Sequence, residues 1–146
     1  MKYFKIILFI SFILLPNLSY AKNPSDLINE IVNDASKVLS SDDPVESKII
    51  KLNNIAEKNV DINGIGMYTL GKYRKSILEE DKSKYQKLFK SYFLKSFSSR
   101  LVDYTDPKIN VASEKKISDK YTIVNSVLEA KNGRPEVKID WRIYTK

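Results

Sequence analysis

Three of the four glycines of this 146-residue chain lie close together, in the segment VDINGIGMYTLGKYRK at residues 60–75. A Gly-x-Gly pair followed by cations suggests a site for phosphate. A P-loop, however, needs a lysine and then a serine or threonine, after a buried strand, whereas Lys72 is followed by Tyr73. We therefore expect a short helix here, capped by Asn63. Because glycine destabilises a helix, Gly71 is predicted to mark a point where another backbone or a ligand approaches closely.

Side chains suited to catalysis are scarce. The chain contains no histidine and no cysteine, which excludes serine–histidine and cysteine–histidine catalysis and the usual zinc sites. Asp103, Tyr104 and Asp140 remain as acid or base candidates, without an evident partner. Asp140 also alternates away from the strand face that carries Trp141. We expect no enzyme activity, no metal and no cofactor.

The N-terminus has the layout of a secretory signal peptide. Lys2 and Lys5 precede an apolar run at residues 6–15, and small residues precede a cleavage site after Ala21. The apolar run is too short to span a bilayer, although an uncleaved anchor is the alternative. Cleavage would leave one domain, residues 22–146, and would lower the formal net charge from +7 to +5. This charge suits anionic surfaces such as phospholipid headgroups, or serves solubility alone.

Two helices are expected first in the mature chain. Asn23 is predicted to cap the first helix, with Pro24 at its first position. Its apolar stripe is expected at Leu27, Ile31, Ala35 and Val38. Asp43 and Pro44 repeat the start signal for the second helix, and Glu46 completes a capping box.

A long helix over residues 79–102 carries most of the aromatic side chains. Tyr85, Phe89, Phe93, Phe97 and Leu101 recur every fourth residue, with Leu88 and Tyr92 beside them. At 3.6 residues per turn, these positions cover more than half of the helix circumference. Two interpretations follow: a core helix packed on two sides, or a helix with part of its face lining a cavity for an apolar ligand.

Strands follow the helices. Residues 108–116, 121–130 and 136–144 show apolar alternation, and Asn132-Gly133 is a turn signal. The last segment alternates Val137, Ile139, Trp141 and Ile143 with polar residues, as in a half-buried antiparallel strand. The predicted fold class is therefore α+β, with N-terminal helices packed on one face of an antiparallel sheet.

Several motifs in this order resemble those of the MlaC family, also called the toluene-tolerance auxiliary family. They are LGKY at residues 70–73, LF at 88–89, SSRL at 98–101 and DWR at 140–142. The resemblance covers roughly residues 62–146. It implies a sheet of the nuclear transport factor 2-like type combined with a helical part.

The resemblance also implies a function. Family members are periplasmic phospholipid carriers that move lipid between an outer-membrane lipoprotein complex and an inner-membrane ABC transporter complex, and so maintain outer-membrane lipid asymmetry. No nucleic-acid partner is expected, and membrane contact is expected to be peripheral. Members continue beyond the DWR strand with another strand and a C-terminal helix, so a shortened, less stable and self-associating product is expected.

Two sets of site residues follow from the residues and the resemblance. Acyl tails are expected to contact a cavity wall of apolar side chains, and a headgroup or a partner protein is expected to contact three cations. The cations are Lys72, Arg74 and Lys75. The wall candidates are Leu70, Tyr73, Phe89, Tyr92, Phe93, Phe97, Leu101, Ile123, Val127, Ile139 and Trp141. A non-lipid envelope adaptor and an inactive remnant remain the alternatives.

Overall fold

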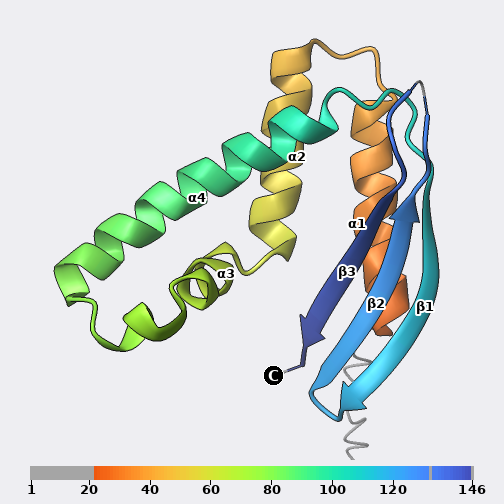
Figure 1. The fold of residues 1–146 in the computed structure, drawn as a ribbon. Helices are drawn as coiled ribbons and strands as arrows, with labels where there is room; N and C mark the ends of the chain where they lie inside the picture. Colours follow the sequence, from red (N-terminus) through yellow and green to blue (C-terminus); the bar gives the residue numbers. More distant parts are fainter. Residues whose placement is uncertain (1–21, 132, 146) are drawn as a thin grey trace, which may run out of the picture.

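Helices precede strands throughout the part of the chain that the computed structural model describes, residues 22–131 and 133–145 (Figure 1). This order confirms the predicted α+β fold. The predicted signal peptide and its cleavage site after Ala21 lie outside the described residues. The elements are α1 (Pro24–Leu39), α2 (Val45–Asn59), α3 (Ile62–Thr69), the short 3₁₀ helix η1 (Gly71–Lys75), α4 (Glu79–Leu101), β1 (Ile109–Ser118), β2 (Tyr121–Leu128) and β3 (Val137–Tyr144).

Three helix caps were predicted from the sequence. One of them is confirmed, and the other two are wrong. The Asn23 side chain accepts a hydrogen bond from the Ser25 amide at 2.9 Å, and Pro24 opens α1, as predicted. The predicted Asp43 cap is wrong, because its carboxylate accepts from Ser41 and Lys51 instead, and α2 starts without a side-chain cap.

The cap of α3 also differs from the prediction. It is Asp61, not Asn63, and the Asp61 carboxylate accepts from the Gly64 amide at 2.9 Å. An acidic side chain at this position also suits the positive end of the helix dipole.

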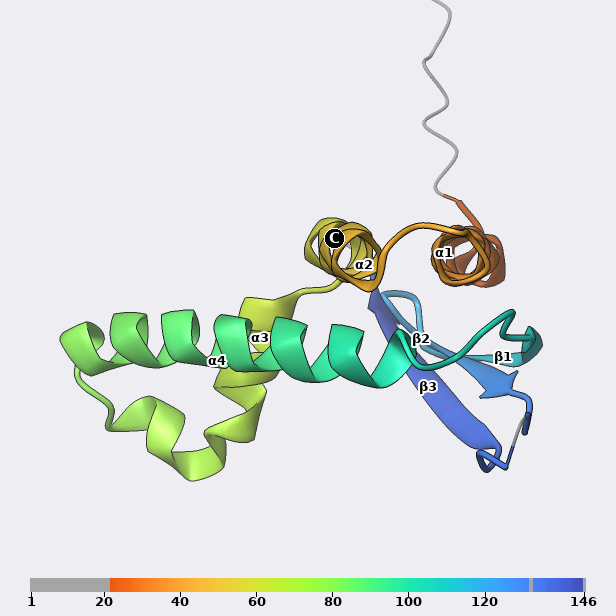
Figure 2. The same ribbon diagram turned by 90° about the horizontal axis from the view of Figure 1, so that it is seen from above.

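The three strands form an antiparallel sheet in the order β1-β2-β3, and α1 covers one of its faces (Figure 2). We call this the inner face. Along β2 the buried side chains alternate with half-buried ones, and Val124 is fully buried opposite Trp141 of β3. The first core cluster joins Ile28 and Val32 of α1 to Val124.

The buried stripe of α1 differs from the predicted one. Ala35 is buried as predicted, but the residues buried with it are Ile28, Val32 and Leu39, whereas Leu27, Ile31 and Val38 are only half-buried. Both stripes have helical spacing, and α1 turns the fully buried one toward both the sheet and α2. The position of these two neighbours explains the difference.

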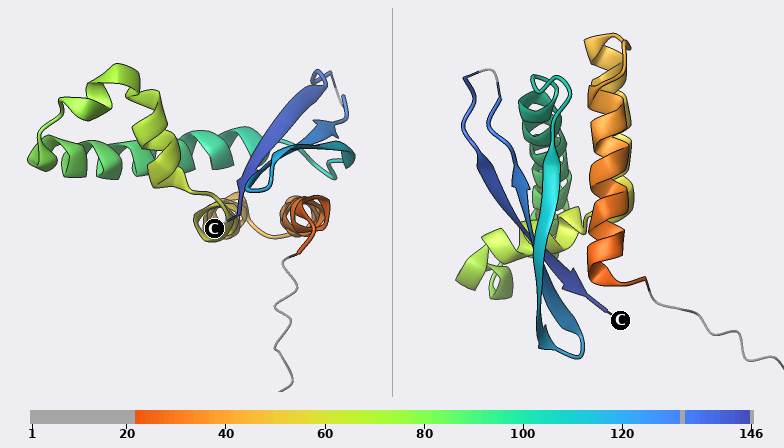
Figure 3. Two further views of the ribbon diagram at one scale, coloured as in Figure 1. Left: turned by 90° about the horizontal axis from the view of Figure 1, so that it is seen from below. Right: turned by 90° about the vertical axis from the view of Figure 1, so that its right-hand side faces the viewer.

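A second core cluster fixes the end of α4. Ala35 and Leu39 of α1 pack with Leu52 of α2, and Phe97 and Leu101 of α4 lie against them. From this junction α4 extends away from the sheet, and α3 and η1 lie beneath its far part (Figures 1 and 3). Among the described residues, no helix has both the length and the apolar character needed to cross a bilayer.

Candidate functional site

A row of four aromatic rings runs along α4. Ring centroids are 5.9 Å apart for Tyr85 and Phe89, 6.3 Å for Phe89 and Phe93, and 6.0 Å for the stacked pair Phe93 and Phe97. Residues four apart lie on the same face of a helix, which produces this contact. All four side chains are half-buried. The row is therefore an apolar strip that the described residues cover only partly.

Gly66 allows α3 to pack against this row. A Cβ atom added to Gly66 would lie 2.8 Å from Cδ1 of Phe89, closer than real carbon atoms approach. The Tyr85 hydroxyl donates to the Gly66 carbonyl at 3.1 Å, and the Thr69 hydroxyl donates to the same carbonyl at 2.7 Å. The close approach thus lies at Gly66, and the prediction that placed it at Gly71 is wrong.

Gly71 has a different role. Its φ is +54° and nothing lies within 4 Å of a Cβ built there. A left-handed backbone favours glycine because it has no Cβ to clash. Gly71 therefore makes the bend between α3 and η1.

The wall candidates on the helices divide into three environments. Phe97 and Leu101 pack against the second core cluster. Phe89 and Phe93 are half-buried in the aromatic row. Leu70, which is not part of the row, is half-buried as well. Tyr73 and Tyr92 are 63% and 69% exposed, so both point mainly into solvent.

The sheet candidates lie on opposite faces. Trp141 packs against the first core cluster on the inner face, and Ile139 shares that face because it is two residues away. Ile123 and Val127 alternate with the buried Val124 and therefore lie on the other face. The structure does not bring these four side chains together.

Ser126 is a neighbour of the site that sequence reasoning missed. It is 1% exposed, and its hydroxyl accepts a hydrogen bond from Nε1 of Trp141 at 2.8 Å. The available signal was its position between Val124 and Leu128 on the buried face of β2. This bond fixes the orientation of the indole ring.

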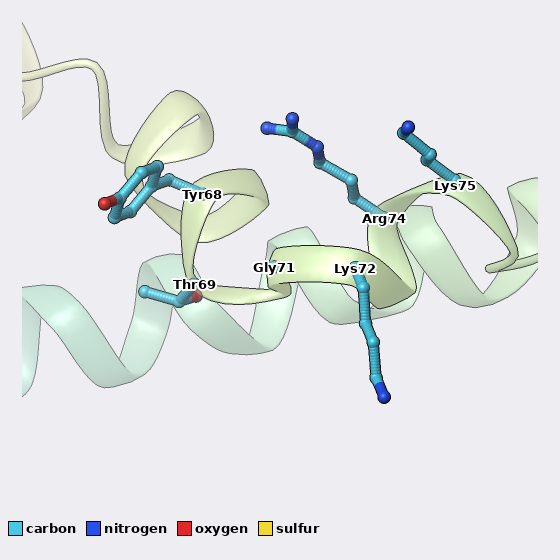
Figure 4. Close-up of a pocket in the computed structure, with 6 residues that line it drawn as sticks. All are labelled: Tyr68, Thr69, Gly71, Lys72, Arg74 and Lys75. Atoms are coloured by element: carbon cyan, nitrogen blue, oxygen red, sulfur yellow. The ribbon is translucent and has the colours of Figure 1, made fainter.

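The three predicted cations line an open hollow of about 680 Å³ beside η1, together with Tyr68, Thr69 and Gly71 (Figure 4). Arg74 and Lys75 point to the same side, whereas Lys72 points the opposite way. Its ammonium lies 5.4 Å from the centroid of the Tyr73 ring. Arg74 and Lys75 are thus the pair that can meet one anionic group together. None of the aromatic-row residues lines this hollow.

The acid and base candidates are all engaged elsewhere. Asp103 pairs with Arg134 at 3.2 Å, and the Arg134 guanidinium lies 5.0 Å from the Tyr104 ring centroid. Asp140 accepts from the Asn125 amide at 2.7 Å. In residues 22–131 and 133–145, no group of three or more acidic side chains converges as a metal site would require.

One carboxylate beside these groups is perturbed. Lys131 donates to Asp106 at 2.9 Å, and this hydrogen bond, together with the lysine charge, lowers the pKa of the Asp106 carboxyl. The bond ties the loop before β1 to the β2–β3 turn. It therefore supports the fold at the surface rather than forming a reactive site.

Comparisons with known proteins give a family and a fold. Residues 25–146 match the family model of the MlaC protein. The fold resembles that of the phospholipid-binding protein from Ralstonia solanacearum, solved in complex with a phospholipid, with a TM-score of 0.69 at 14% identity. The matched region is 86% of this chain and 72% of that one. None of the curated proteins matches the sequence. The family match extends from α1 to the end of β3, and the chain belongs to the MlaC family.

Proposed function

We propose that this protein binds a phospholipid and carries it between membranes. The half-buried aromatic row of α4, on a fold shared with a protein solved in complex with a phospholipid, supports this function best. Family membership supports it as well. The binding is noncovalent and needs no reactive side chain, so the proposal includes no enzyme activity.

Burial of acyl chains supplies the binding energy. Each methylene group removed from water contributes about 0.8 kcal/mol, so a chain of moderate length exceeds the cost of its own ordering. Flat rings along one helix face provide continuous apolar area for such a chain. In the proposed complex the tails lie against Phe89 and Phe93 of the aromatic row.

The headgroup is proposed to meet cations at the edge of the helical part. Arg74 and Lys75 point to the same side of η1 and are exposed to solvent. An arginine fork and a lysine point charge together suit a phosphate group. Lys72 is proposed to contribute less, because it points the other way.

The cellular role is also part of the proposal. We infer that the chain is exported by its N-terminal segment, with cleavage after Ala21, and that it acts in the periplasm. Its partners there would be the outer-membrane lipoprotein complex and the inner-membrane ABC transporter complex. Lipid carriage between the two would maintain outer-membrane asymmetry.

Two adjacent residues of α4 provide the test of tail binding. Phe93 is half-buried in the row, whereas Tyr92 is 69% exposed. Phe93→Asp is expected to reduce the phospholipid that co-purifies, measured by solvent extraction and mass spectrometry, because a carboxylate is costly in an apolar contact. Tyr92→Asp, with the same added charge, is expected to retain the lipid.

Circular dichroism separates lipid loss from unfolding. Phe97→Asp is the wrong test, since Phe97 packs against the second core cluster and its replacement should unfold the helical junction. Equal lipid loss in the Phe93 and Tyr92 variants, with both folded, would contradict tail binding at the row.

A salt series tests the headgroup proposal. Binding to vesicles that contain anionic phospholipid is expected to weaken with salt. Arg74→Ala combined with Lys75→Ala should flatten this salt dependence. Lys84→Ala combined with Lys87→Ala removes the same charge from exposed positions of α4 and should change it less. Identical slopes for the two double variants would exclude the Arg74–Lys75 pair.

A second candidate function is that of a non-lipid binding domain of an envelope complex. The observation that favours it is the open hollow of about 680 Å³ beside η1, where three cations gather on a short segment of the surface. Such a surface suits an acidic partner protein. Absence of phospholipid from repeated preparations, with retained binding to an acidic protein, would favour this function over lipid carriage.

A further inference from the structure

The segment between α2 and α4 lies along the aromatic row. It comprises α3, η1 and their connections, residues 61–77, and we call it the α3–η1 segment. It runs outward from the end of α2, and the chain then turns and returns as α4 (Figures 1 and 3). Among the elements that the structure describes, α3 packs mainly against α4. The segment therefore covers the part of the row that contains Tyr85 and Phe89.

The contact of this segment with the row leaves no space for a ligand. A Cβ atom added to Gly66 would lie 2.8 Å from Cδ1 and 3.1 Å from Cγ of Phe89. A space that excludes a methyl group also excludes a methylene chain. An acyl tail can therefore reach the side of Phe89 that faces Gly66 only if α3 moves away. In the closed position that the structure shows, α3 withholds part of the apolar area of the row.

Extended residues connect the segment at both ends. Val60 lies between α2 and α3 and has φ −116° and ψ 128°. Leu78 lies between η1 and α4 and has φ −66° and ψ 149°. A few residues at the ends of elements can absorb the backbone rotation when one part of a protein moves relative to another. The segment can thus move as a unit about Val60 and Leu78 while its own helices stay formed.

The helices on either side of the segment are fixed to each other. Lys90 of α4 pairs with Glu57 of α2 at 3.3 Å. Phe97 and Leu101 of α4 also pack against the cluster that contains Leu52 of α2. α2 and α4 can therefore hold their relative positions while the segment between them moves.

The polar contact between the segment and α4 can open without leaving a polar group unpaired. The Tyr85 hydroxyl donates to the Gly66 carbonyl at 3.1 Å and lies 2.7 Å from the Thr69 hydroxyl oxygen. The Thr69 hydroxyl donates to the same carbonyl from within α3, at 2.7 Å. When α3 moves away, the carbonyl keeps this bond and the Tyr85 hydroxyl can bond to water. The movement therefore exchanges one hydrogen bond for another, which changes the free energy only slightly, and it gives up the small contact area of a glycine.

We propose that the α3–η1 segment is a lid, which separates from α4 to admit or release an acyl tail and otherwise closes over the row. The proposal rests on the proposed phospholipid binding. Arg74 and Lys75 belong to the lid, so the cations proposed to bind the headgroup move with it. Opening of the lid would thus withdraw the headgroup contact and uncover the tail contact in one movement.

A reversible disulfide between the lid and α4 tests the movement. The chain contains no cysteine, so Gly66→Cys combined with Phe89→Cys introduces the only two thiols. The distances at Gly66 suit the Cβ separation of about 3.5–4.5 Å that a disulfide requires.

The reduced double variant is loaded with phosphatidylglycerol that carries a fluorescent acyl chain, and transfer of this lipid to unlabelled phosphatidylglycerol vesicles is timed. Oxidation after loading should slow the transfer by about tenfold or more, because the disulfide holds the lid closed, and reduction should restore the rate. Phe89→Cys alone is the control, because its single thiol cannot link the lid to α4. Oxidation should leave its transfer rate unchanged.

Removal of a single hydroxyl group is the second test, and it leaves Phe89 in place. Tyr85→Phe keeps the ring in the row and removes only the hydrogen bond to Gly66. It should speed the transfer about two- to tenfold, which is the effect of one hydrogen bond on the opening equilibrium. Tyr92→Phe is the matched control on the same helix. Because Tyr92 is 69% exposed, loss of its hydroxyl should leave the rate unchanged.

The outcomes separate the lid from lipid binding itself. Equal transfer rates in the oxidised and reduced states of lipid-loaded protein would overturn the lid and leave lipid binding intact. Equal rates for Tyr85→Phe and Tyr92→Phe would overturn it too, and this comparison decides the question if the double cysteine variant binds no lipid. Failure of the disulfide to form in the folded protein would contradict the contact between α3 and α4. An unmodified protein that carries no phospholipid would overturn both the proposed function and the lid.

Discussion

Replacing Gly66 with alanine tests how α3 is fixed to the aromatic row. Gly66 is buried, and its added methyl group would lie 2.8 Å from Cδ1 and 3.1 Å from Cγ of Phe89. The neighbouring atoms belong to a ring held between Tyr85 and Phe93, with centroids 5.9 and 6.3 Å away. The ring cannot turn aside without disturbing the row.

Two opposing effects set the size of the change. Forcing a methyl group into a packed contact costs about 1–3 kcal/mol. Alanine in place of glycine within a helix gains about 1 kcal/mol. The free energy of unfolding is therefore expected to fall by up to about 2 kcal/mol, because the cost of the clash exceeds the gain in helix stability.

The background variant Phe89→Leu should reverse the sign. Leucine removes the ring that the methyl group meets, so Gly66→Ala should then stabilise the protein by about 1 kcal/mol. The matched control is Phe93→Leu, which removes a ring one turn farther along α4. In that background Gly66→Ala should stay as unfavourable as in the unmodified protein.

Urea unfolding followed by circular dichroism and by Trp141 fluorescence measures all six proteins of this comparison. A double-mutant cycle between positions 66 and 89 should give a coupling free energy of about 1–3 kcal/mol. Additive effects at these positions, or equal coupling to position 93, would refute the close approach of Gly66 to Phe89.

Three further predictions each concern a single residue. Ser126→Ala leaves the Trp141 N–H without its partner and should cost about 1–3 kcal/mol in urea unfolding, whereas adding Trp141→Phe should recover part of this loss; no recovery would contradict the bond. Pairing with Lys131 lowers the pKa of the Asp106 carboxyl. The stability that this ion pair gives the folded protein is therefore present near neutral pH and is lost as the pH falls through the lowered pKa, below the usual 3.8. Asp106→Asn, which tolerates the φ of 51°, should thus be slightly less stable than the unmodified protein at pH 7 and equal to it in strong acid; a stability difference that persists in acid would exclude the ion pair as its cause. Gly71→Val should cost more than Gly71→Asn in thermal unfolding, since only asparagine accepts a positive φ readily, and equal melting temperatures would contradict the left-handed bend.

Local patterns in the sequence determined much of this protein. The Asn23-Pro24 pair fixed the start of α1, because capping depends only on residues within one turn. The four-residue spacing of Tyr85, Phe89 and Phe93 placed their rings in a row, since helix geometry alone brings such positions together. Alternation along residues 136–144 predicted a strand with one apolar face, and β3 confirms it. The short motifs around residues 70–142 identified the family correctly.

Competition between neighbouring groups limited even local prediction. Asp43 and Asn63 both have the chemistry of a cap, yet neither caps a helix. Asp43 is held by Ser41 and Lys51, and Lys51 lies two turns away along α2. Asp61 caps α3 from a position that sequence reasoning passed over. Where a side chain has several possible hydrogen-bond partners, the partner that it takes depends on where all of them lie in the folded chain.

Tertiary structure alone decided which small or apolar residue makes each contact. Gly66 and Gly71 are equally small, but only Gly66 meets a ring from α4, while Gly71 makes a bend. Phe93 and Phe97 share one helix face, yet only Phe97 lies against the core of α1 and α2. Helical and strand periodicity state which residues share a face. Which neighbour covers that face depends on the crossing of elements distant in sequence, and no local pattern of residues contains that information.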